Sequence, residues 1–166
     1  MLTLQPATTN DIDTIRQLAW NIFPATYREI LSPGQLTYMM EWMYSEASLR
    51  TQMEEEGHTY LLARDGDEAI GYVSVQPENG QLWCLQKIYV LPERQGQHVG
   101  SFLFDHAIQF IRDHSTGPCA MELHVNRENK ALTFYQSKGM VIDSEGDFPI
   151  GQGYEMNDYI MRMEIR

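Results

Sequence analysis

The sequence predicts an α+β fold in which a mixed sheet of about seven strands is flanked by helices. Three features predict it: apolar residues recur at helical spacing in the first third of the chain, apolar and polar residues alternate from about residue 58, and helical and alternating segments then follow one another to the C-terminus. The resulting order is strand, two or three helices, three strands, helix, strand, helix and two strands. Because short turns join the three successive strands, we expect them to form an antiparallel meander.

Capping and turn residues set the expected boundaries. Ser32 is a good N-cap, and Pro33 follows at the first helical position, where a missing N–H costs nothing. Gly57 can end a helix in the left-handed conformation. The predicted elements are a strand at 3–7, helices at 8–23, 32–44 and 45–56, strands at 58–64, 68–76 and 81–91, a helix from about 100 to 113, a strand at 119–126, a helix at 128–138, and strands at 140–145 and 154–165.

The composition predicts one globular domain over residues 1–166. With 43% hydrophobic and 21% charged residues the chain does not resemble a disordered one, and no apolar run approaches the roughly 20 residues of a membrane helix. The opening MLTLQPATTN has neither the basic start nor the apolar stretch of a secretory signal. We therefore expect a cytoplasmic protein with no membrane partner.

The net charge of −11 makes a nucleic-acid partner improbable, because phosphate backbones select basic surfaces. It favours a cationic partner, although an acidic surface can also serve solubility alone. The five histidines show no metal-ligand spacing, so no metal is expected. The sequence leaves the oligomeric state open, a homodimer included.

The run RQGQHVGSF, residues 94–102, lies between a predicted strand and a predicted helix. Its two glycines suggest a loop whose N–H groups converge on an anion, and the alternative is a tight connection that binds nothing. A nucleotide P-loop is excluded because only three residues separate Gly96 from Gly100 and Ser101 follows instead of lysine. A dinucleotide fingerprint is excluded because its third glycine is absent. An anion cradle at the start of a helix, formed by amides near residues 97–101, remains.

Two segments resemble motifs of the GNAT superfamily of acyl-CoA-dependent N-acyltransferases. LQKIYVLPERQGQHVGSFLFDHA is similar to its cofactor-binding segment, with Gln95, His98 and Gly100 on the motif positions. VNRENKALTFYQSKGM is similar to its Asn-x-x-Ala-x-x-Phe-Tyr helix. The resemblance spans essentially the whole chain and implies a three-layer fold and acetyl-CoA as co-substrate. His98 replaces the first glycine of the loop pattern, so this residue must avoid any conformation that a Cβ forbids.

The resemblance also implies where coenzyme A binds. Its pyrophosphate is expected at the loop, and its pantetheine arm is expected to pair with an open strand edge at residues 87–90. The spacing leaves open whether Asn126 or Asn129 contacts the cofactor, and we favour Asn129. The expected cofactor-binding residues are Ile88, Tyr89, Val90, Gln95, Gly96, Gln97, His98, Val99, Gly100, Ser101, Asn129, Lys130 and Tyr135.

Acyl transfer to an amine requires a base and an acid. An alkylammonium with a pKa near ~10.4 is protonated at neutral pH, and a departing thiolate gains from a positioned proton donor. The resemblance implies Tyr135 as that acid and a strand amide near Tyr89 or Val90 as the group that polarises the carbonyl. The sequence does not identify the base: Glu122 is the first candidate, and Glu29 acting through water is the second.

The acceptor is expected between the first strand and the meander, where the family builds its acceptor pocket. Tyr27, Glu29, Tyr38 and Trp42 could line a slot for an aliphatic amine, and the alternative is an ordinary core helix. We expect an N-acetyltransferase that acts by direct attack in a ternary complex on a small cationic primary amine such as a polyamine. The alternatives are a protein N-terminus or an aminoglycoside as acceptor, or a non-catalytic acyl-CoA-binding module.

Overall fold

A seven-stranded sheet runs through the computed structural model, which describes residues 1–166. The strand order is β1-β2-β3-β4-β5-β7-β6, and every neighbouring pair is antiparallel except β4 and β5, which are parallel. This confirms the predicted α+β fold with a mixed, mostly antiparallel sheet and the meander β2–β3–β4. The strands are β1 Leu2–Pro6, β2 Thr59–Asp65, β3 Glu68–Asn79, β4 Leu82–Val90, β5 Cys119–Asn126, β6 Val141–Gly151 and β7 Tyr154–Ile165.

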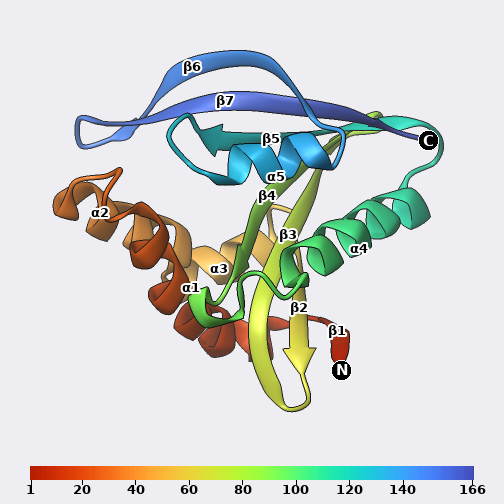
Figure 1. Cartoon of the computed structure of the whole chain (residues 1–166), viewed down its shortest axis with the longest axis horizontal. Coiled ribbons are helices and arrows are strands. Elements are labelled where there is room, and N and C mark those ends of the chain that lie inside the picture. The colour runs from red at the N-terminus through yellow and green to blue at the C-terminus, as the bar shows by residue number, and fades with distance from the viewer.

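Helices cover both faces of this sheet and make three layers (Figure 1). Successive residues of β3 point to opposite faces: the Tyr72 hydroxyl lies 2.6 Å from the Tyr44 hydroxyl of α2, whereas a Cβ on Gly71 would lie 3.2 Å from Leu103 of α4. Helices α1 to α3 therefore cover one face, and α4 covers the other together with α5. None of the helices is long and apolar enough to cross a membrane. The helices are α1 Ile12–Tyr27, α2 Pro33–Tyr44, α3 Glu46–Glu54, α4 Val99–His114 and α5 Ala131–Ser137.

The sheet is split at its centre, between β4 and β5. These strands pair only from Leu82 to Cys84 on β4 and from Ala120 to Glu122 on β5. A bulge at Gln86 then shifts the register of β4 against β3, because Ser74 faces Lys87 while Val75 faces Leu85. Beyond this bulge β4 continues to Val90 without a partner on its β5 side. The open edge expected at residues 87–90 is therefore present.

The two elements that differ most from their predicted lengths are α5 and β6. Helix α5 begins at Ala131 instead of residue 128, because the Asn126 side chain accepts the Glu128 N–H and the Asn129 side chain accepts the Ala131 N–H, which fixes turns before the helix. Strand β6 extends through Pro149, which is compatible with its position at the edge of the sheet.

Candidate active site

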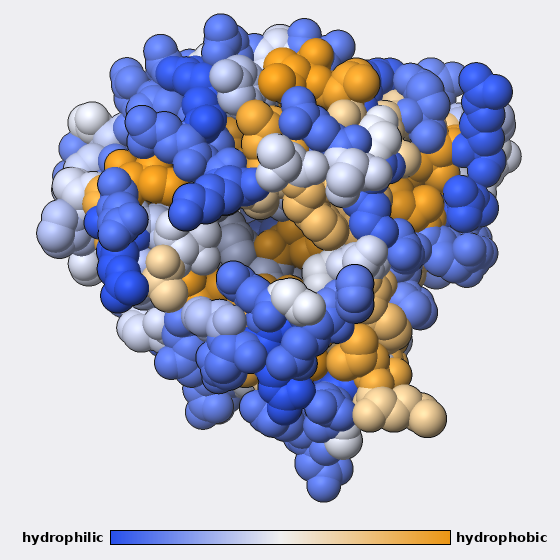
Figure 2. Space-filling model, in the orientation of Figure 1, coloured by the Kyte–Doolittle hydropathy of each residue, from blue (hydrophilic) through white to orange (hydrophobic).

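The split in the sheet opens into a cavity of about 1130 Å³. Its walls come from the C-terminal end of α1 and the residues that follow it, the free part of β4, the loop before α4, the start of α4, the C-terminal half of β5 and the α5 region. Figure 2 shows the molecule hollowed near its centre, with apolar residues deep in the hollow. The cavity therefore joins an exposed loop to an apolar interior between β4 and β5.

The loop before α4 presents backbone N–H groups at the mouth of this cavity. Gly96 has a φ of 82°, and His98 has a φ of 64° and a ψ of 15°, immediately before the helix begins at Val99. The first N–H groups of a helix have no acceptor within it, and no N–H from Gly96 to Ser101 donates to another protein group. The helix dipole adds positive potential at the same place, so the loop has the donors and the potential that suit an anion.

His98 takes the left-handed conformation itself. This conformation is sparsely populated by residues with a Cβ but not forbidden to them, and histidine is among those that adopt it more often. The expectation that His98 avoids forbidden conformations therefore holds, but the loop keeps a glycine-like backbone at a residue that is not glycine.

Two side-chain cations near this loop are already paired within the protein. Arg94 is held by Asp65 and Glu68, each at 2.8 Å, and Lys138 by Asp105 at 2.9 Å. Lys130 lines the cavity and makes no ion pair. The loop amides and Lys130 are therefore the donors at this place that no partner within the protein occupies.

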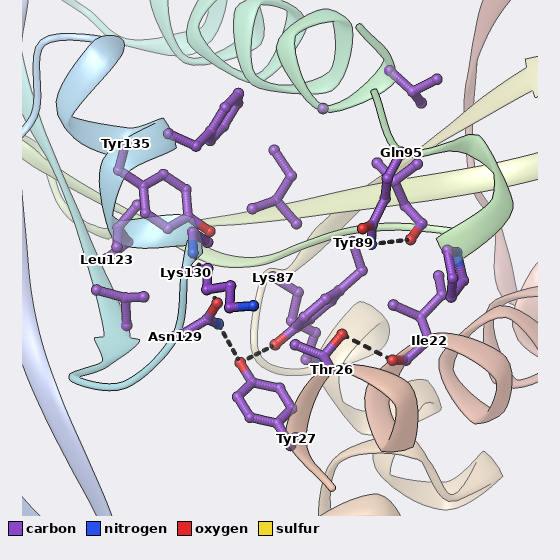
Figure 3. A pocket seen from close by; sticks show the side chains of 18 of the residues that line it. Ile22, Thr26, Tyr27, Lys87, Tyr89, Gln95, Leu123, Asn129, Lys130 and Tyr135 are labelled. Atoms are coloured by element: carbon purple, nitrogen blue, oxygen red, sulfur yellow. Dashed lines mark hydrogen bonds between the residues drawn. The ribbon is translucent and has the colours of Figure 1, made fainter. Parts of the chain in front are cut away.

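Tyr135 projects from α5 into the cavity (Figure 3). Its ring lies 6.5 Å from that of Phe104, and the residue is only 7% exposed. Burial raises the pKa of its phenol, so the hydroxyl stays protonated at neutral pH. A protonated phenol in this position can donate to a leaving group in the cavity.

Tyr27 connects three elements at the base of the cavity. Its hydroxyl lies 3.1 Å from the Tyr89 hydroxyl of β4 and accepts a hydrogen bond of 3.2 Å from Nδ2 of Asn129, just before α5 (Figure 3). Asn129 lines this cavity, whereas Asn126 lines a second one. Asn129 therefore lines the cavity and also ties the start of α5 to the end of α1 through Tyr27.

The second cavity has a volume of about 630 Å³ and lies between α2, α3 and the sheet. Three carboxylates line it, from Glu56, Glu78 and Asp158, together with the buried amine of Lys87. The two cavities meet at the split in the sheet. The residues that line both are Tyr27, Leu85, Gln86, Lys87, Tyr89 and His124.

The structure brings most of the expected cofactor-binding residues together. Only Gln97 of that set is absent from the wall of the first cavity, and it lies in the exposed part of the loop. The members that line it are Ile88, Tyr89, Val90, Gln95, Gly96, His98, Val99, Gly100, Ser101, Asn129, Lys130 and Tyr135.

The residues expected around the acceptor are dispersed. Tyr27 lines both cavities and Trp42 lines the second cavity. Glu29 lines the first cavity, where its side chain is exposed to solvent. Tyr38 lines neither, because its hydroxyl donates to the Ile150 carbonyl and ties α2 to β6.

Glu122 does not reach either cavity. It sits where β5 is still paired with β4, and its carboxylate binds Arg162 on β7 at 3.2 Å. Its role as the base stays a prediction, and in this structure its carboxylate is held in an ion pair outside the cavity wall. His124 and Asp158, which are not among the predicted site residues, line the second cavity instead. His124 lies two residues beyond Glu122, on the same face of β5, and this spacing is the one signal that could have indicated it.

Comparisons with known proteins agree with this geometry. Residues 12–140 match the family model of the acetyltransferase (GNAT) family. The chain is 25% identical over 154 residues to the N-acetyltransferase YuaI of Bacillus subtilis, covering 90% of this chain and 86% of that one. Its fold is similar to the PaiA N-acetyltransferase from Thermoplasma acidophilum in complex with coenzyme A, with a TM-score of 0.83, 19% identity and 99% of each chain covered. It is also similar to the spermidine/spermine N-acetyltransferase SpeG from Vibrio cholerae, with a TM-score of 0.69, 20% identity, and 98% of this chain and 93% of that chain covered.

The chain therefore belongs to the GNAT family and is an acetyl-CoA-dependent N-acetyltransferase. The first cavity fits this co-substrate. Its unpaired loop amides match a pyrophosphate, and the unpaired edge of β4 matches the amides of a pantetheine arm. When bound, acetyl-CoA would supply an acetyl thioester, and the residues that line the first cavity are the ones that would hold it.

Proposed function

We propose that this enzyme transfers the acetyl group of acetyl-CoA to a primary amine of a small cationic molecule, with a polyamine as the first candidate. The observation that carries this proposal is the meeting of two cavities at the split between β4 and β5. The first has the amides and the strand edge for coenzyme A, and the second has carboxylates for an ammonium group.

The second cavity suits a small acceptor. Its volume of about 630 Å³ lies within the usual range for small-molecule sites. Its carboxylates and the net charge of −11 favour a cation over an anion. The structural similarity to a spermidine/spermine N-acetyltransferase points in the same direction.

Direct attack in a ternary complex follows from this arrangement, because both substrates can occupy the site at once. Tyr135 is the proton donor to the leaving sulfur, and its raised pKa keeps the phenol protonated for that role. A β4 amide near Tyr89 or Val90 polarises the carbonyl. Loop residues Gly96 to Ser101 bind the pyrophosphate. We propose that residues 1–166 act as one catalytic domain, with a homodimer as the assembly to test.

The test is release of free thiol from acetyl-CoA against a panel of amines, with mass spectrometry of the products. The panel contains spermidine, putrescine, an aminoglycoside and a peptide with a free N-terminus. Acetylation of the polyamines above the other amines supports the proposal. Acetylation of the peptide or the aminoglycoside alone changes the acceptor class. Tight binding of acetyl-CoA with no acetylated amine overturns the proposal in favour of a binding module.

A further inference from the structure

A buried carboxylate without a hydrogen-bond partner faces the second cavity. The side chain of Asp158, on β7, is only 3% exposed, and its Oδ2 atom has no hydrogen-bond donor within the protein. Burying such an acceptor is costly unless it has a partner. The basic side chain that lies within 4.0 Å of it is His124 on β5, whose Nδ1 atom is 3.5 Å from Oδ2.

The sheet itself places these side chains together. Asn126 pairs with Asp158 and His124 pairs with Ile160, so His124 and Asp158 are diagonal neighbours on one face of two antiparallel strands. The His124 ring also lies 5.1 Å from the Phe148 ring of β6, which supports one side of the imidazole. The orientation of the pair is therefore fixed by strand register and packing.

His124, unlike Asp158, lies where the two cavities meet. It lines both cavities, and its side chain is 39% exposed. It can therefore contact an amine that approaches from the second cavity toward a thioester in the first, and it can release a proton to water. Asp158 lines only the second cavity and is nearly closed to solvent.

We propose that His124 is the base that takes a proton from the ammonium group of the acceptor, and that Asp158 is its positioning residue. The assignment rests on the proposed function. Asp158 accepts the Nδ1–H of the imidazole, which leaves Nε2 unprotonated and facing the acceptor. The separation of 3.5 Å is long for a hydrogen bond, and such contacts commonly shorten when substrate is bound.

The proton balance of the transfer is complete with these groups. One proton of the ammonium passes to Nε2 of His124, and the nitrogen lone pair then forms the C–N bond. As the C–S bond breaks with its electron pair on sulfur, Tyr135 gives its phenol proton to sulfur and takes back the second proton lost by nitrogen. His124 finally releases its proton to water. The products are the acetylated amine, free thiol and one proton.

The other candidate bases are less suited. Glu122 is neutralised by Arg162 outside the cavities, and Glu29 is exposed at the first cavity alone. Glu56, His58 and Glu78 line the second cavity alone, so none of them borders the first cavity as His124 does. The Lys87 amine lines both cavities but is already held by Gln52.

The kinetic test compares two amines of similar size and different basicity. Ethylamine is protonated at pH 7, whereas 2,2,2-trifluoroethylamine is largely neutral and needs no base before attack. We expect His124→Gln to lower kcat/KM by about 10²-fold for ethylamine and far less for trifluoroethylamine, as loss of general base catalysis predicts. His106→Gln is the matched control, because His106 binds the Phe102 carbonyl on α4 and lines neither cavity. Equal losses for both amines, or no loss, would overturn the proposal.

A second test needs no acceptor. Nitrogen-15 NMR of the imidazoles should show His124 of the free protein as the Nδ1–H tautomer, and Asp158→Asn should shift it toward Nε2–H by offering an N–H to Nδ1. A wild-type Nε2–H tautomer overturns the pairing, and an unchanged tautomer in Asp158→Asn removes Asp158 from it. If the wild-type enzyme acetylates no amine, the proposed function fails, and the NMR result still decides the pairing.

Discussion

The Nζ atom of Lys87 lies 2.8 Å from Oε1 of Gln52, inside the protein between β4 and α3. Lys87 also donates to the Tyr60 hydroxyl, which itself donates to the same Gln52 oxygen, and its ammonium lies 4.7 Å from the Tyr44 ring. Lys87 is 7% exposed, and no carboxylate pairs with it. Burial lowers the pKa of Lys87 to about 7, against a smaller opposing effect from Glu56.

This lowered pKa predicts that Lys87→Met stabilises the protein at low pH. The unfolded chain holds the lysine proton up to a pKa near 10.5, whereas the folded protein releases it near 7. The free energy of unfolding of the wild type therefore rises with pH between these two values. Below pH 7 the destabilisation caused by the buried ammonium is fully present. Methionine removes the buried charge and leaves the Tyr60–Gln52 hydrogen bond in place. We expect about 1–3 kcal/mol of added stability at pH 6, declining toward pH 10, measured by urea unfolding.

The control for this prediction is Lys130→Met, since Lys130 is exposed. Lys130→Met should change the free energy of unfolding only a little, and by the same amount at pH 6 and at pH 10. A Lys87→Met protein that is less stable than the wild type at pH 6 would contradict the view that the buried ammonium destabilises the fold.

The sequence predicted the order of the elements and the anion-binding loop because both depend on local patterns. Each of these signals depends on a few neighbouring residues, as the helix cap at Ser32 and the spacing of Gly96 and Gly100 show. The acceptor side depends instead on contacts between distant segments. Nothing in the local sequence shows that Lys87 meets Gln52, or that β5 and β7 align His124 with Asp158.

The two candidate bases on β5, Glu122 and His124, show the same limit. Glu122 and His124 lie on the same face of β5, so alternation alone cannot rank them. What separates them is the end of the pairing between β4 and β5 at Glu122 and the position of Arg162 on β7. Both are properties of strand register, which the sequence pattern leaves undetermined.

Tyr135→Phe should reduce turnover without disturbing the fold. The Tyr135 hydroxyl makes no hydrogen bond within the protein, so its loss leaves no buried group unpaired. We expect kcat to fall by about 10²-fold if the phenol is the acid, with the KM for acetyl-CoA within a few-fold of wild type. Thermal unfolding checks the fold, and steady-state thiol release checks the rate.

The matched control is Tyr159→Phe, because Tyr159 lies on β7 and lines neither cavity. Its kcat should equal that of the wild type. An unchanged kcat in Tyr135→Phe would remove the acid role from this tyrosine and leave it as part of the cavity wall.

His98→Gly should retain binding of acetyl-CoA and a stable loop. His98 has a φ of 64°, which glycine adopts without a Cβ penalty, so this relief offsets the entropy that glycine adds to the unfolded chain. Gln97→Gly, one residue earlier, gains no such relief because Gln97 is not in the left-handed region. We expect Gln97→Gly to be less stable than His98→Gly by about 1 kcal/mol in urea unfolding.

Calorimetry of coenzyme A binding completes this comparison. If backbone amides dominate the anion site, His98→Gly keeps the dissociation constant within a few-fold, because the imidazole is lost while the N–H groups remain. A loss of about 100-fold would show that the His98 side chain, rather than the backbone, holds the pyrophosphate.

Tyr27 should couple energetically to Tyr89 because their hydroxyls share one hydrogen bond at 3.1 Å across α1 and β4. Tyr27→Phe removes this bond and the acceptor of Asn129, and we expect it to cost about 1–2 kcal/mol, since buried donors lose their partners. Tyr89→Phe breaks only the first bond, so it should cost less. In the double variant the shared hydrogen bond is lost only once. Its loss of unfolding free energy should therefore be smaller than the sum of the two single losses by about 0.5–1.5 kcal/mol in urea unfolding. Strict additivity would mean that the two hydroxyls do not interact in solution, and that packing rather than this bond holds α1 against the open edge of β4.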